Sequence, residues 1–495
     1  MSYIAQRQRL RAPRVWLLAV FVATVALITF PLYPDTWFFW ERMLGSYLTF
    51  VWTFPAVMSS VAAVGAVLAW LSITSSGRER ARLAQSDAFL IIQVPTIGRH
   101  DVMPALTRAV RSYVESAPTG FVNWRVDVVA EETSEAIEEL DALASGRVRV
   151  LYVPTAYTTP NATERKARAN HWADALRRRE GELRPDVWVL HMDDDTGIAP
   201  DTIREIASFI ESNPVGDPEA KVFGQGVLTY PRSYAKKLMV WVADSIRPSS
   251  DLSFFRAATG SGRPLFGAHG ELLLIRADIE STIGWDFGRL LSITEDANFA
   301  LTFAHRYPGR SGWFPGRCFG SAPESFSDLV TQRKRWCRGL LHVVTNRELP
   351  LRVRFVLGYG IATWVLGPLQ HVIIVLAIAV AFQLRYTAPL QQWLLLPWAV
   401  HTSIGLWMYL EGMRANRDAS HPEDRRWWHY LLLLCYPVLS LIEAWAALKG
   451  FVAFIKDRMG RNDADLFEVI RKTHVEGIDV ESVLQGSTRT GRTRT

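Results

Sequence analysis

The sequence contains few cysteines, and none of them stands in a metal-binding pair. Cys318, Cys337 and Cys435 are the only three, they lie far apart, and no CxxC spacing occurs. A disulfide framework needs several paired cysteines, and a structural zinc site needs closely spaced ligands. The scarcity therefore supports neither of them, and it favours a reducing compartment.

Two glycine-rich nucleotide-binding patterns are also absent. Neither GxGxxG nor GxxxxGK[ST] follows any of the strands expected below, although these patterns are what let a backbone approach phosphates closely. Their absence argues against a Rossmann dinucleotide site and against a P-loop. No internal repeat is evident, which argues against a solenoid.

The composition hides blocks of different character. The 495 residues are 49% hydrophobic and include 19 Trp, which is too apolar for a disordered chain. This length corresponds to roughly two to four structural units. The net charge of +6 is concentrated beside the apolar blocks, so we expect membrane lipids and no nucleic acid as a partner.

Two uncharged apolar runs near the N-terminus predict a transmembrane hairpin over residues 1–85. The runs span residues 15–33 and 46–73 and approach or exceed the roughly 20 residues that a helix needs to cross a bilayer. A cleaved signal peptide would not be followed at once by a second span. Arginines before and after the hairpin place both its ends in the cytoplasm.

Three further apolar runs predict transmembrane and interfacial helices over residues 346–460. They span residues 355–382, 393–411 and 430–455. We expect an even number of crossings, because an odd number would place the arginine-bearing tail outside, against the positive-inside rule. Residues 461–495 then form a cytoplasmic, partly disordered tail.

Between residues 86 and 345, short apolar stretches alternate with amphipathic ones. This alternation predicts an α/β domain with a mostly parallel sheet. Because ligands gather at the carboxyl ends of parallel strands, residues just after the strands are the first site candidates. Strands are expected at 88–95, 125–130, 148–153 and 186–192, and a helix at 103–116.

Three adjacent carboxylates, Asp193, Asp194 and Asp195, follow the fourth expected strand. Their mutual repulsion is most easily offset by a divalent cation, which prefers oxygen ligands. Asp193 and Asp195 form a D-x-D pair that would position Mg²⁺ or Mn²⁺ against a nucleotide diphosphate. The alternative is a solvated acidic turn that caps the next helix.

Two further patterns follow along the chain. Thr294-Glu295-Asp296 precedes an apolar stretch and is typical of a helix start, where acidic residues are favoured by the helix dipole. The segment QRKRW, residues 332–336, lies in a helix-compatible stretch that leads toward the membrane. Read alone, such a basic run is equally typical of an anionic-lipid anchor.

In combination and in this order, D-x-D, TED and QxxRW resemble the family-2 membrane glycosyltransferases, which include cellulose and hyaluronan synthases. The resemblance is closest to the egghead-type β-1,4-mannosyltransferases. It implies a GT-A catalytic domain over residues 86–345, flanked by transmembrane helices. The matching stretches include KARAN (166–170), HMDDDT (191–196), FGQGVLTYP (223–231), PLFGAHGELLL (264–274), SITEDANFA (292–300) and APESFSDL (322–329).

Chemistry accounts for these residue types. A departing diphosphate must be neutralised, which a metal on Asp193 and Asp195 and the guanidinium of Arg335 would do. The acceptor hydroxyl must lose a proton, and the resemblance implies that Asp296 is the base. In-line attack without a carboxylate nucleophile inverts the anomeric centre. The resemblance also implies that Glu295 belongs to the catalytic group, and that Asp194 and Gln332 contact the diphosphate.

The remaining site assignments follow from the resemblance alone. Glu131 stands where the family usually has an aspartate at the nucleotide, and Trp336 offers a flat platform for the acceptor sugar, or else an interfacial anchor. Arg247 and Asp251 match without an assigned role. Implied donor-binding residues are Lys166 and Asn170, and implied acceptor-binding residues are His269 and Glu271.

The implied activity is transfer of mannose from GDP-mannose to a lipid-linked or membrane-presented glycan, forming a β-1,4 linkage with Mg²⁺ or Mn²⁺. The protein would be a multi-pass integral protein of the plasma membrane with its catalytic domain in the cytoplasm. Composition alone does not select mannose, so a processive β-glycan synthase that uses a UDP-sugar remains the alternative.

Two other classes of protein compete with an enzyme. A transporter predicts ionisable residues clustered within its spans, but the sequence offers only His371 and Glu443 there, with no matched pair. A pseudoenzyme scaffold would retain the fold alone, and the intact carboxylates and QRKRW argue against it.

Overall fold

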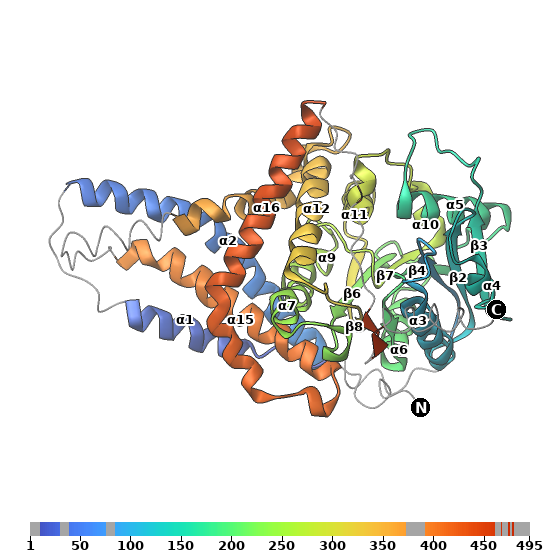
Figure 1. Cartoon of the computed structure of the whole chain (residues 1–495), viewed down its shortest axis with the longest axis horizontal. Coiled ribbons are helices and arrows are strands. Elements are labelled where there is room, and N and C mark those ends of the chain that lie inside the picture. The colour runs from blue at the N-terminus through green and yellow to red at the C-terminus, as the bar shows by residue number, and fades with distance from the viewer. Residues whose placement is uncertain are drawn as a thin grey trace, which may run out of the picture.

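The structure, a computed structural model, describes residues 10–29, 39–75, 85–372 and 392–460, together with residue 467 and the short strands 474–475 and 478–479. Figure 1 shows two parts. Long helices extend to one side, and an α/β domain forms the other. Most of the predicted tail and residues 373–382 of one predicted apolar run lie outside the described residues.

An eight-stranded sheet forms the centre of the domain, with the strand order β3-β2-β1-β4-β7-β6-β8-β5. Its strands are β1 (Ser86–Pro95), β2 (Phe121–Glu131), β3 (Val148–Val153), β4 (Val187–His191), β5 (Gly197–Ile198), β6 (Phe223–Thr229), β7 (Leu273–Arg276) and β8 (Ser311–Phe319).

The four strands that the sequence predicts form the parallel half of this sheet. β3, β2, β1 and β4 all run parallel. The middle of β1 is buried on both faces: Leu90 and Ile92 pack toward α3 and α6, whereas Ile91 packs toward α10 and α11. A strand covered on both sides reads as an unbroken apolar run, which is why these strands and the helix at 103–116 are confirmed.

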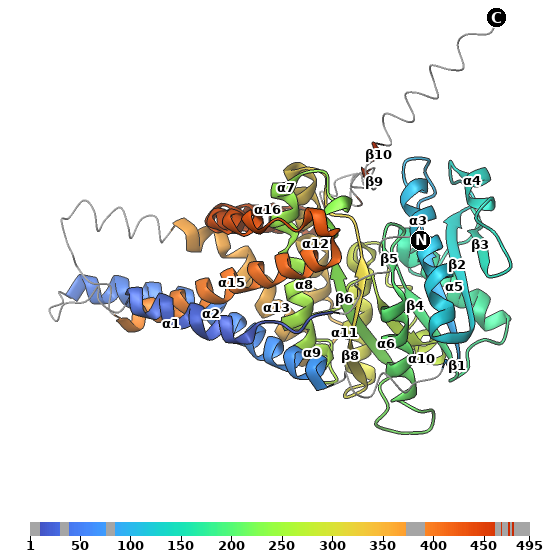
Figure 2. The ribbon, with the colours of Figure 1, turned by 90° about the horizontal axis from the view of Figure 1, so that it is seen from below.

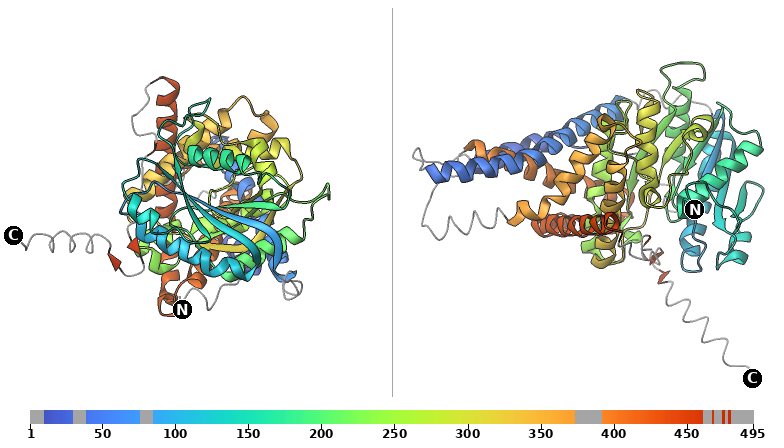
Figure 3. Two further views of the ribbon diagram at one scale, coloured as in Figure 1. Left: turned by 90° about the vertical axis from the view of Figure 1, so that its right-hand side faces the viewer. Right: turned by 90° about the horizontal axis from the view of Figure 1, so that it is seen from above.

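The other half of the sheet is mixed, so the prediction of a mostly parallel sheet was wrong for it. β7 runs antiparallel to both β4 and β6, and β5 runs antiparallel to β8, whereas β6 and β8 are parallel. The chain between β6 and β7 passes through short helices at residues 238–259, and an antiparallel pair does not require the crossover connection that parallel strands need. Figure 3 shows the strong twist of the complete sheet.

Helices cover the sheet and join it to the long helices. Those of the domain are α3 (Met103–Ser116), α4 (Ile137–Asp141), α5 (Arg165–Arg179), α6 (Pro200–Glu211), α7 (Leu238–Asp244), α8 (Ile246–Ser250), the π-helix η5 (Asp251–Phe255), α9 (Arg256–Thr259), α10 (Ala277–Ile283), α11 (Glu295–Arg306) and α12 (Phe326–Thr345). The others are α1 (Val15–Thr29), α2 (Phe39–Ser75), α13 (Leu351–Val365), α15 (Gln392–Ala419), the 3-10 helix η8 (Trp427–Cys435) and α16 (Tyr436–Arg458).

Helix α12 is held tightly against α16. A Cβ atom added at Gly450 of α16 would lie 2.6 Å from the Cβ of Cys337 in α12, so only glycine permits this approach. Cys337 and Ala447 are both fully buried in the same apolar cluster. The helix that carries the QRKRW segment is therefore fixed in place by α16.

Among the residues that the structure describes, two helical segments are long and apolar enough to cross a membrane: Val51–Ser75 in α2, and Trp427–Arg458 in η8 and α16. In α1 the apolar stretch is shorter, Val15–Thr24. Figures 1 and 2 show that α16 runs crosswise to α2 and α15. Helices in such an arrangement do not both cross one flat bilayer, and the number of crossings that the sequence predicts stays a prediction.

Candidate functional site

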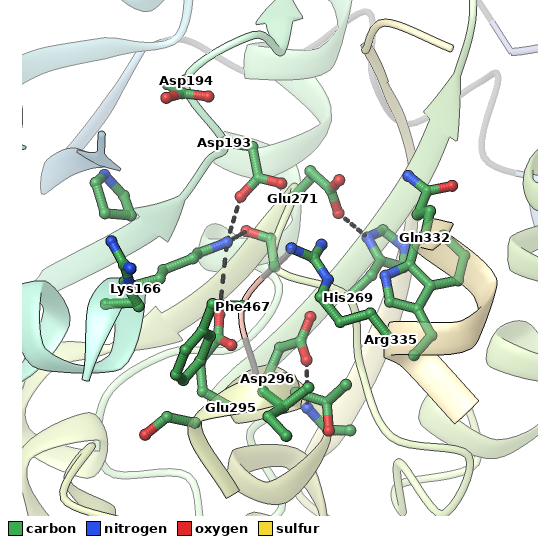
Figure 4. Close-up of a pocket in the computed structure, with 18 of the residues that line it drawn as sticks. Lys166, Asp193, Asp194, His269, Glu271, Glu295, Asp296, Gln332, Arg335 and Phe467 are labelled. Carbon is green, nitrogen blue, oxygen red and sulfur yellow. Dashed lines mark hydrogen bonds and ion pairs between the residues drawn. The ribbon is translucent and has the colours of Figure 1, made fainter. Parts of the chain in front are cut away.

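A cavity of about 400 Å³ lies at the carboxyl ends of β1, β2 and β4, between α5 and α12 (Figure 4). Segments more than 140 residues apart along the chain converge on it. The predicted site residues that line it are Glu131, Lys166, Asp193, Asp194, His269, Glu271, Glu295, Asp296, Gln332, Arg335 and Trp336.

One wall of the cavity is acidic and is bridged by a single ammonium group. Lys166, from the first turn of α5, forms an ion pair with Asp193, and its Nζ lies 3.8 Å from Oε1 of Glu295. Nζ also donates to the carbonyl of Gly270 at 3.5 Å. Burial by itself lowers the pKa of Lys166, but Asp193 and Glu295 outweigh it and hold that pKa above its usual value. Lys166 is therefore a permanent cation.

Two neighbouring carboxylates begin helix α11 on this wall. Burial, together with repulsion from Asp296, raises the pKa of Glu295 to about 8. Burial also raises the pKa of Asp296, Lys166 partly offsets this, and Glu271 and Asp193 raise it further. Oδ1 of Asp296 accepts from the amide of Ala297 at 2.8 Å. A carboxylate with a raised pKa accepts a proton more readily than an exposed one.

The three aspartates after β4 do not all face the cavity. Asp193 and Asp194 line it, and Asp194 accepts from Oγ1 of Thr96 at 2.8 Å. Asp195 is only 1% exposed and accepts from the amide of Ser321 at 3.3 Å. The amide of Thr196 donates to the carbonyl of Asp193 at 3.2 Å, so the chain turns here and directs Asp195 away. The structure does not bring the predicted metal-binding pair Asp193 and Asp195 together.

The charge of this wall fits a divalent cation, although the ligand set differs from the predicted one. Asp193, Glu295 and Asp296 lie around the ammonium of Lys166, and Asp194 also lines the cavity, which gives the wall the oxygen ligands that a hard cation prefers. Among the residues that the structure describes, however, no three His, Cys, Asp or Glu side chains lie close enough to form a complete site. Asp193 and Asp194 are the carboxylates placed to contribute ligands beside a bound diphosphate.

The neighbouring wall, which carries His269 and Glu271, is balanced in charge. His269 lies 3.3 Å from Glu271 through Nδ1 and 3.1 Å from Asp251 through Nε2. Burial lowers the pKa of His269, but these carboxylates outweigh it and raise the value to about 9. Burial would raise the pKa of Glu271, yet His269, Lys166 and Arg247 hold it well below its usual range. This wall neutralises itself.

Trp336 lies between two guanidinium groups. Arg247 stands 4.7 Å and Arg333 stands 4.4 Å from the centre of its ring system. Cations over an aromatic face stabilise its orientation. Nη1 of Arg333 also donates to Oε1 of Gln332 at 2.7 Å. The structure thus gives Arg247 a place in the site, whereas the sequence assigned it none.

Two of the implied donor-binding residues have other contacts. Asn170 is fully buried, does not line the cavity, and accepts from Nε2 of Gln93 at 2.8 Å. It lies one turn beyond Lys166 in α5. The first turn of this helix borders the cavity, whereas the next turn packs on the sheet. Glu131 lines the cavity but is engaged in an ion pair with Arg168.

Sequence reasoning missed several aromatic and basic residues of the cavity. Phe255 packs edge-on against His269, with ring centres 5.5 Å apart, and Phe467 lies under the guanidinium of Arg165 at 5.7 Å. Phe255 follows Asp251 at helical spacing, which places both on one face. No local signal marks Phe467, because it reaches the cavity from a distant part of the chain.

The family model described as "Glycosyl transferase family group 2" matches residues 188–455. The β-1,4-mannosyltransferase egh of Drosophila melanogaster is 26% identical over 327 residues, which are 66% of this chain and 66% of that protein. The β-1,4-mannosyltransferase bre-3 of Caenorhabditis elegans is 29% identical over 224 residues, which are 45% of this chain and 47% of that protein. The matches thus span less than two thirds of either relative.

Solved structures resemble this chain only loosely. A complex of the mannosyltransferase PcManGT from Pyrobaculum calidifontis with GDP-Man and Mn²⁺ is 12% identical, covers 74% of this chain and 98% of its own, and gives a TM-score of 0.36. A structure of S. aureus TarS is also 12% identical, covers 75% and 92%, and gives 0.31. Scores this low establish no detailed structural correspondence.

Proposed function

This chain belongs to glycosyl transferase family group 2, whose model covers more than half of it, and we propose that it is a metal-dependent, inverting mannosyltransferase. The proposed reaction moves mannose from GDP-mannose to a lipid-linked or membrane-presented glycan and forms a β-1,4 linkage. The similarity to two β-1,4-mannosyltransferases supports the choice of sugar.

The observation that carries the proposal is the convergence of three separated motifs on one cavity. Asp193 follows β4, Asp296 begins α11, and Arg335 and Trp336 lie on α12, yet all four line the same space. Sugar transfer needs an acidic group, a base and a cation for the leaving group within a few ångströms of one another. No simpler role explains why these side chains share one cavity.

In the proposed reaction, the acceptor hydroxyl oxygen attacks the anomeric carbon from the side opposite the diphosphate. The bond between this carbon and the diphosphate oxygen breaks, and its electron pair remains on that oxygen. The hydroxyl proton passes to a carboxylate oxygen of Asp296. The raised pKa of Asp296 suits it to hold that proton, and an inverted, β-configured product results.

Positive side chains would stabilise the leaving group. The guanidinium of Arg335 and the amide of Gln332 face the cavity from α12, where they are placed to bind diphosphate oxygens. Lys166 is a half-buried cation on the other side. A bound Mg²⁺ or Mn²⁺ would supply Lewis-acid neutralisation of the diphosphate, held through Asp193 and Asp194.

The charge-balanced wall is proposed to bind the acceptor. A neutral sugar requires directed hydrogen bonds and an apolar surface, without net charge. His269 and Glu271 offer the first, and the indole of Trp336 offers the second. Trp336 therefore acts as a platform in this proposal, in addition to any contact with the membrane.

We further propose that residues 86–345 form a cytoplasmic GT-A catalytic domain. In this proposal residues 1–85 and 346–460 anchor it to the plasma membrane, and the α2 segment Val51–Ser75 is the strongest candidate for a crossing. This arrangement presents the cavity to nucleotide sugars in the cytoplasm and to acceptors in the membrane.

A donor screen with the purified full chain tests the function. GDP-mannose, UDP-glucose and UDP-N-acetylglucosamine are each supplied with Mn²⁺ and a lipid extract, and the lipid-extractable product is analysed by mass. We expect mannose incorporation from GDP-mannose alone. Exclusive use of a UDP-sugar would contradict the choice of donor and favour a β-glycan synthase instead.

A further inference from the structure

A second cavity, of about 550 Å³, lies apart from the sugar-transfer site. It opens between the turn at residues 232–238, which leads into α7, and the segment 424–429, which leads into η8. Three cationic side chains and one carboxylate give it a positive charge. The side chains that define its chemistry are Arg232, Lys236, Asp424, Arg426, Trp428 and His429.

The charge of this cavity is only partly matched within the chain. Lys236 forms an ion pair with Glu324 at 3.2 Å. Burial lowers the pKa of Arg232, and the negative charge of Asp424 offsets only part of this decrease. Arg426 is exposed. These arginines therefore favour binding of an anion in the cavity. A guanidinium donates two hydrogen bonds to phosphate oxygens in a fixed geometry.

An exposed apolar stripe begins beside the same cavity and continues along η8 and α16. Trp427 is 70% exposed and Leu434 is 83% exposed, and the members follow at intervals of three or four residues as far as Trp445, after which the next is Val452. The opposite face of α16 packs on α12. The exposed members of the stripe are Trp427, Leu431, Leu434, Val438, Leu441, Trp445, Val452 and Ile455.

This combination is typical of a helix that lies along a bilayer surface. One face of α16 is covered by the domain, the other offers large apolar side chains, and the helix runs crosswise to α2 (Figures 1 and 2). Tryptophans at its beginning belong at the depth of lipid headgroups. The cavity beside Trp428 would then lie at the level of the phosphates.

We propose that the cavity between residues 232–238 and 424–429 binds the phosphate group of an anionic phospholipid at the membrane surface. Arg232 and Arg426 bind the phosphate oxygens, Trp428 contacts the glycerol region, and the acyl chains extend along the exposed stripe of η8. The site thereby fixes the height of the catalytic domain above the bilayer.

Thermal unfolding of the detergent-solubilised full chain tests this site. Short-chain phosphatidylglycerol, phosphatidylcholine of the same chain length, and inorganic phosphate are compared as probes. We expect phosphatidylglycerol alone to raise Tm, because a ligand that binds only the folded chain stabilises it. Arg232→Gln and Arg426→Gln should each remove most of this increase. Lys237→Gln, an exposed neighbour that does not line the cavity, should retain it.

Three results would overturn the proposal. An equal increase with inorganic phosphate would identify a site for free anions, and an equal increase with phosphatidylcholine would show that the headgroup charge is not recognised. An equal loss in Lys237→Gln would show diffuse attraction by surface charge. Since Arg426 is exposed, its variant keeps the test decisive even if Arg232→Gln fails to fold.

A separate set of contacts concerns Arg333, which lies within QRKRW but does not line the sugar-transfer cavity. Its side chain is 2% exposed and pairs with Asp244 of α7 and, at 2.9 Å, with Glu443 of α16. The same guanidinium donates to Gln332 and stacks over Trp336. Glu443 thus has a partner, although the sequence suggested none.

We infer that Arg333 is a positioning residue, which holds Gln332 and Trp336 in their orientations. Because Arg333 also pairs with Glu443, the position of α16 affects both of these side chains. This inference rests on the proposed function. A lysine at position 333 would keep the charge, but its single ammonium group would not reach two carboxylates, an amide oxygen and an indole face at once.

Arg333→Lys is compared with Arg338→Lys, a matched change on the same helix. Arg338 is equally buried and pairs with Asp457 of α16, but it does not line the cavity. We expect similar decreases in Tm for both. Only Arg333→Lys should lower kcat and raise both the acceptor KM, through Trp336, and the donor KM, through Gln332, with a loss of about 10²-fold in kcat/KM.

Equal kinetic losses in the two variants would show that Arg333 merely stabilises the fold and would overturn the inference. Absence of any sugar transfer by the native chain would instead contradict the proposed function. The two failures are therefore distinguishable.

Discussion

The two walls of the cavity differ in how their charges are matched. On one wall, Asp193, Glu295 and Asp296 face the single ammonium of Lys166. On the other, His269 and Arg247 match Glu271 and Asp251. A wall of grouped carboxylates is suited to a cation from outside, whereas a wall whose charges pair with one another is suited to an uncharged ligand. In the proposed function, the metal and diphosphate therefore bind at the first wall and the acceptor sugar at the second.

The largest expected effect is on the acidic wall, at the proposed base. Asp296→Asn keeps the shape of the side chain but cannot accept a proton. Turnover should fall by roughly 10²- to 10⁴-fold, while binding of the nucleotide sugar, measured by calorimetry, stays nearly unchanged. Unchanged turnover would exclude Asp296 as the base.

The next effect separates the aspartates that follow β4. Asp193 lines the cavity and Asp195 does not, so Asp193→Asn should weaken metal-dependent binding of GDP-mannose by at least about tenfold. Asp195→Asn should lower Tm instead, because its carboxylate accepts from the amide of Ser321. The opposite result, loss of metal binding with Asp195→Asn alone, would restore the ligand pair that the sequence predicted.

The balanced wall should show a pH-dependent stability. The pKa of His269 lies at about 9 in the folded chain against 6.5 for an exposed histidine, so the folded chain holds this proton more tightly. Its stabilisation, up to about 3 kcal/mol, is complete below pH 6.5 and is lost as pH rises through about 9. His269→Gln should flatten the fall of Tm over this interval. An identical slope in both proteins would contradict the assignment.

The smallest effect lies outside both walls, at Asn170. Its amide oxygen accepts from Gln93 within the buried face of α5. Asn170→Ala should therefore lower the free energy of unfolding by about 1 to 3 kcal/mol and leave the donor KM unchanged. A raised donor KM with unchanged Tm would instead support the donor-binding role that the resemblance implied.

Local pattern predicted the parallel half of the sheet but not the mixed half. β1 and β4 are continuous apolar runs because both their faces are covered. β7 spans only Leu273–Arg276, and its direction depends on a loop whose course no periodicity reveals. The aspartates after β4 and the TED segment were found because one follows a strand and the other begins a helix, whereas QRKRW lies inside α12 and was found through the family resemblance.

The orientation of single residues was less predictable. Alternation along an extended strand would place Asp193 and Asp195 on one side, but a turn after Asp193 breaks it. Helical spacing places Asn170 on the same face of α5 as Lys166. Along this face, however, Lys166 borders the cavity, and Asn170, one turn later, packs on the sheet. Phe467 reaches the cavity through tertiary structure alone.

The most direct test of the central claim is sugar transfer from GDP-mannose by the full chain before and after removal of divalent cations. If the acidic wall needs an external cation to hold the diphosphate, chelation should abolish transfer, and added Mn²⁺ or Mg²⁺ should restore it. Transfer that continues at the same rate after complete chelation would contradict the account.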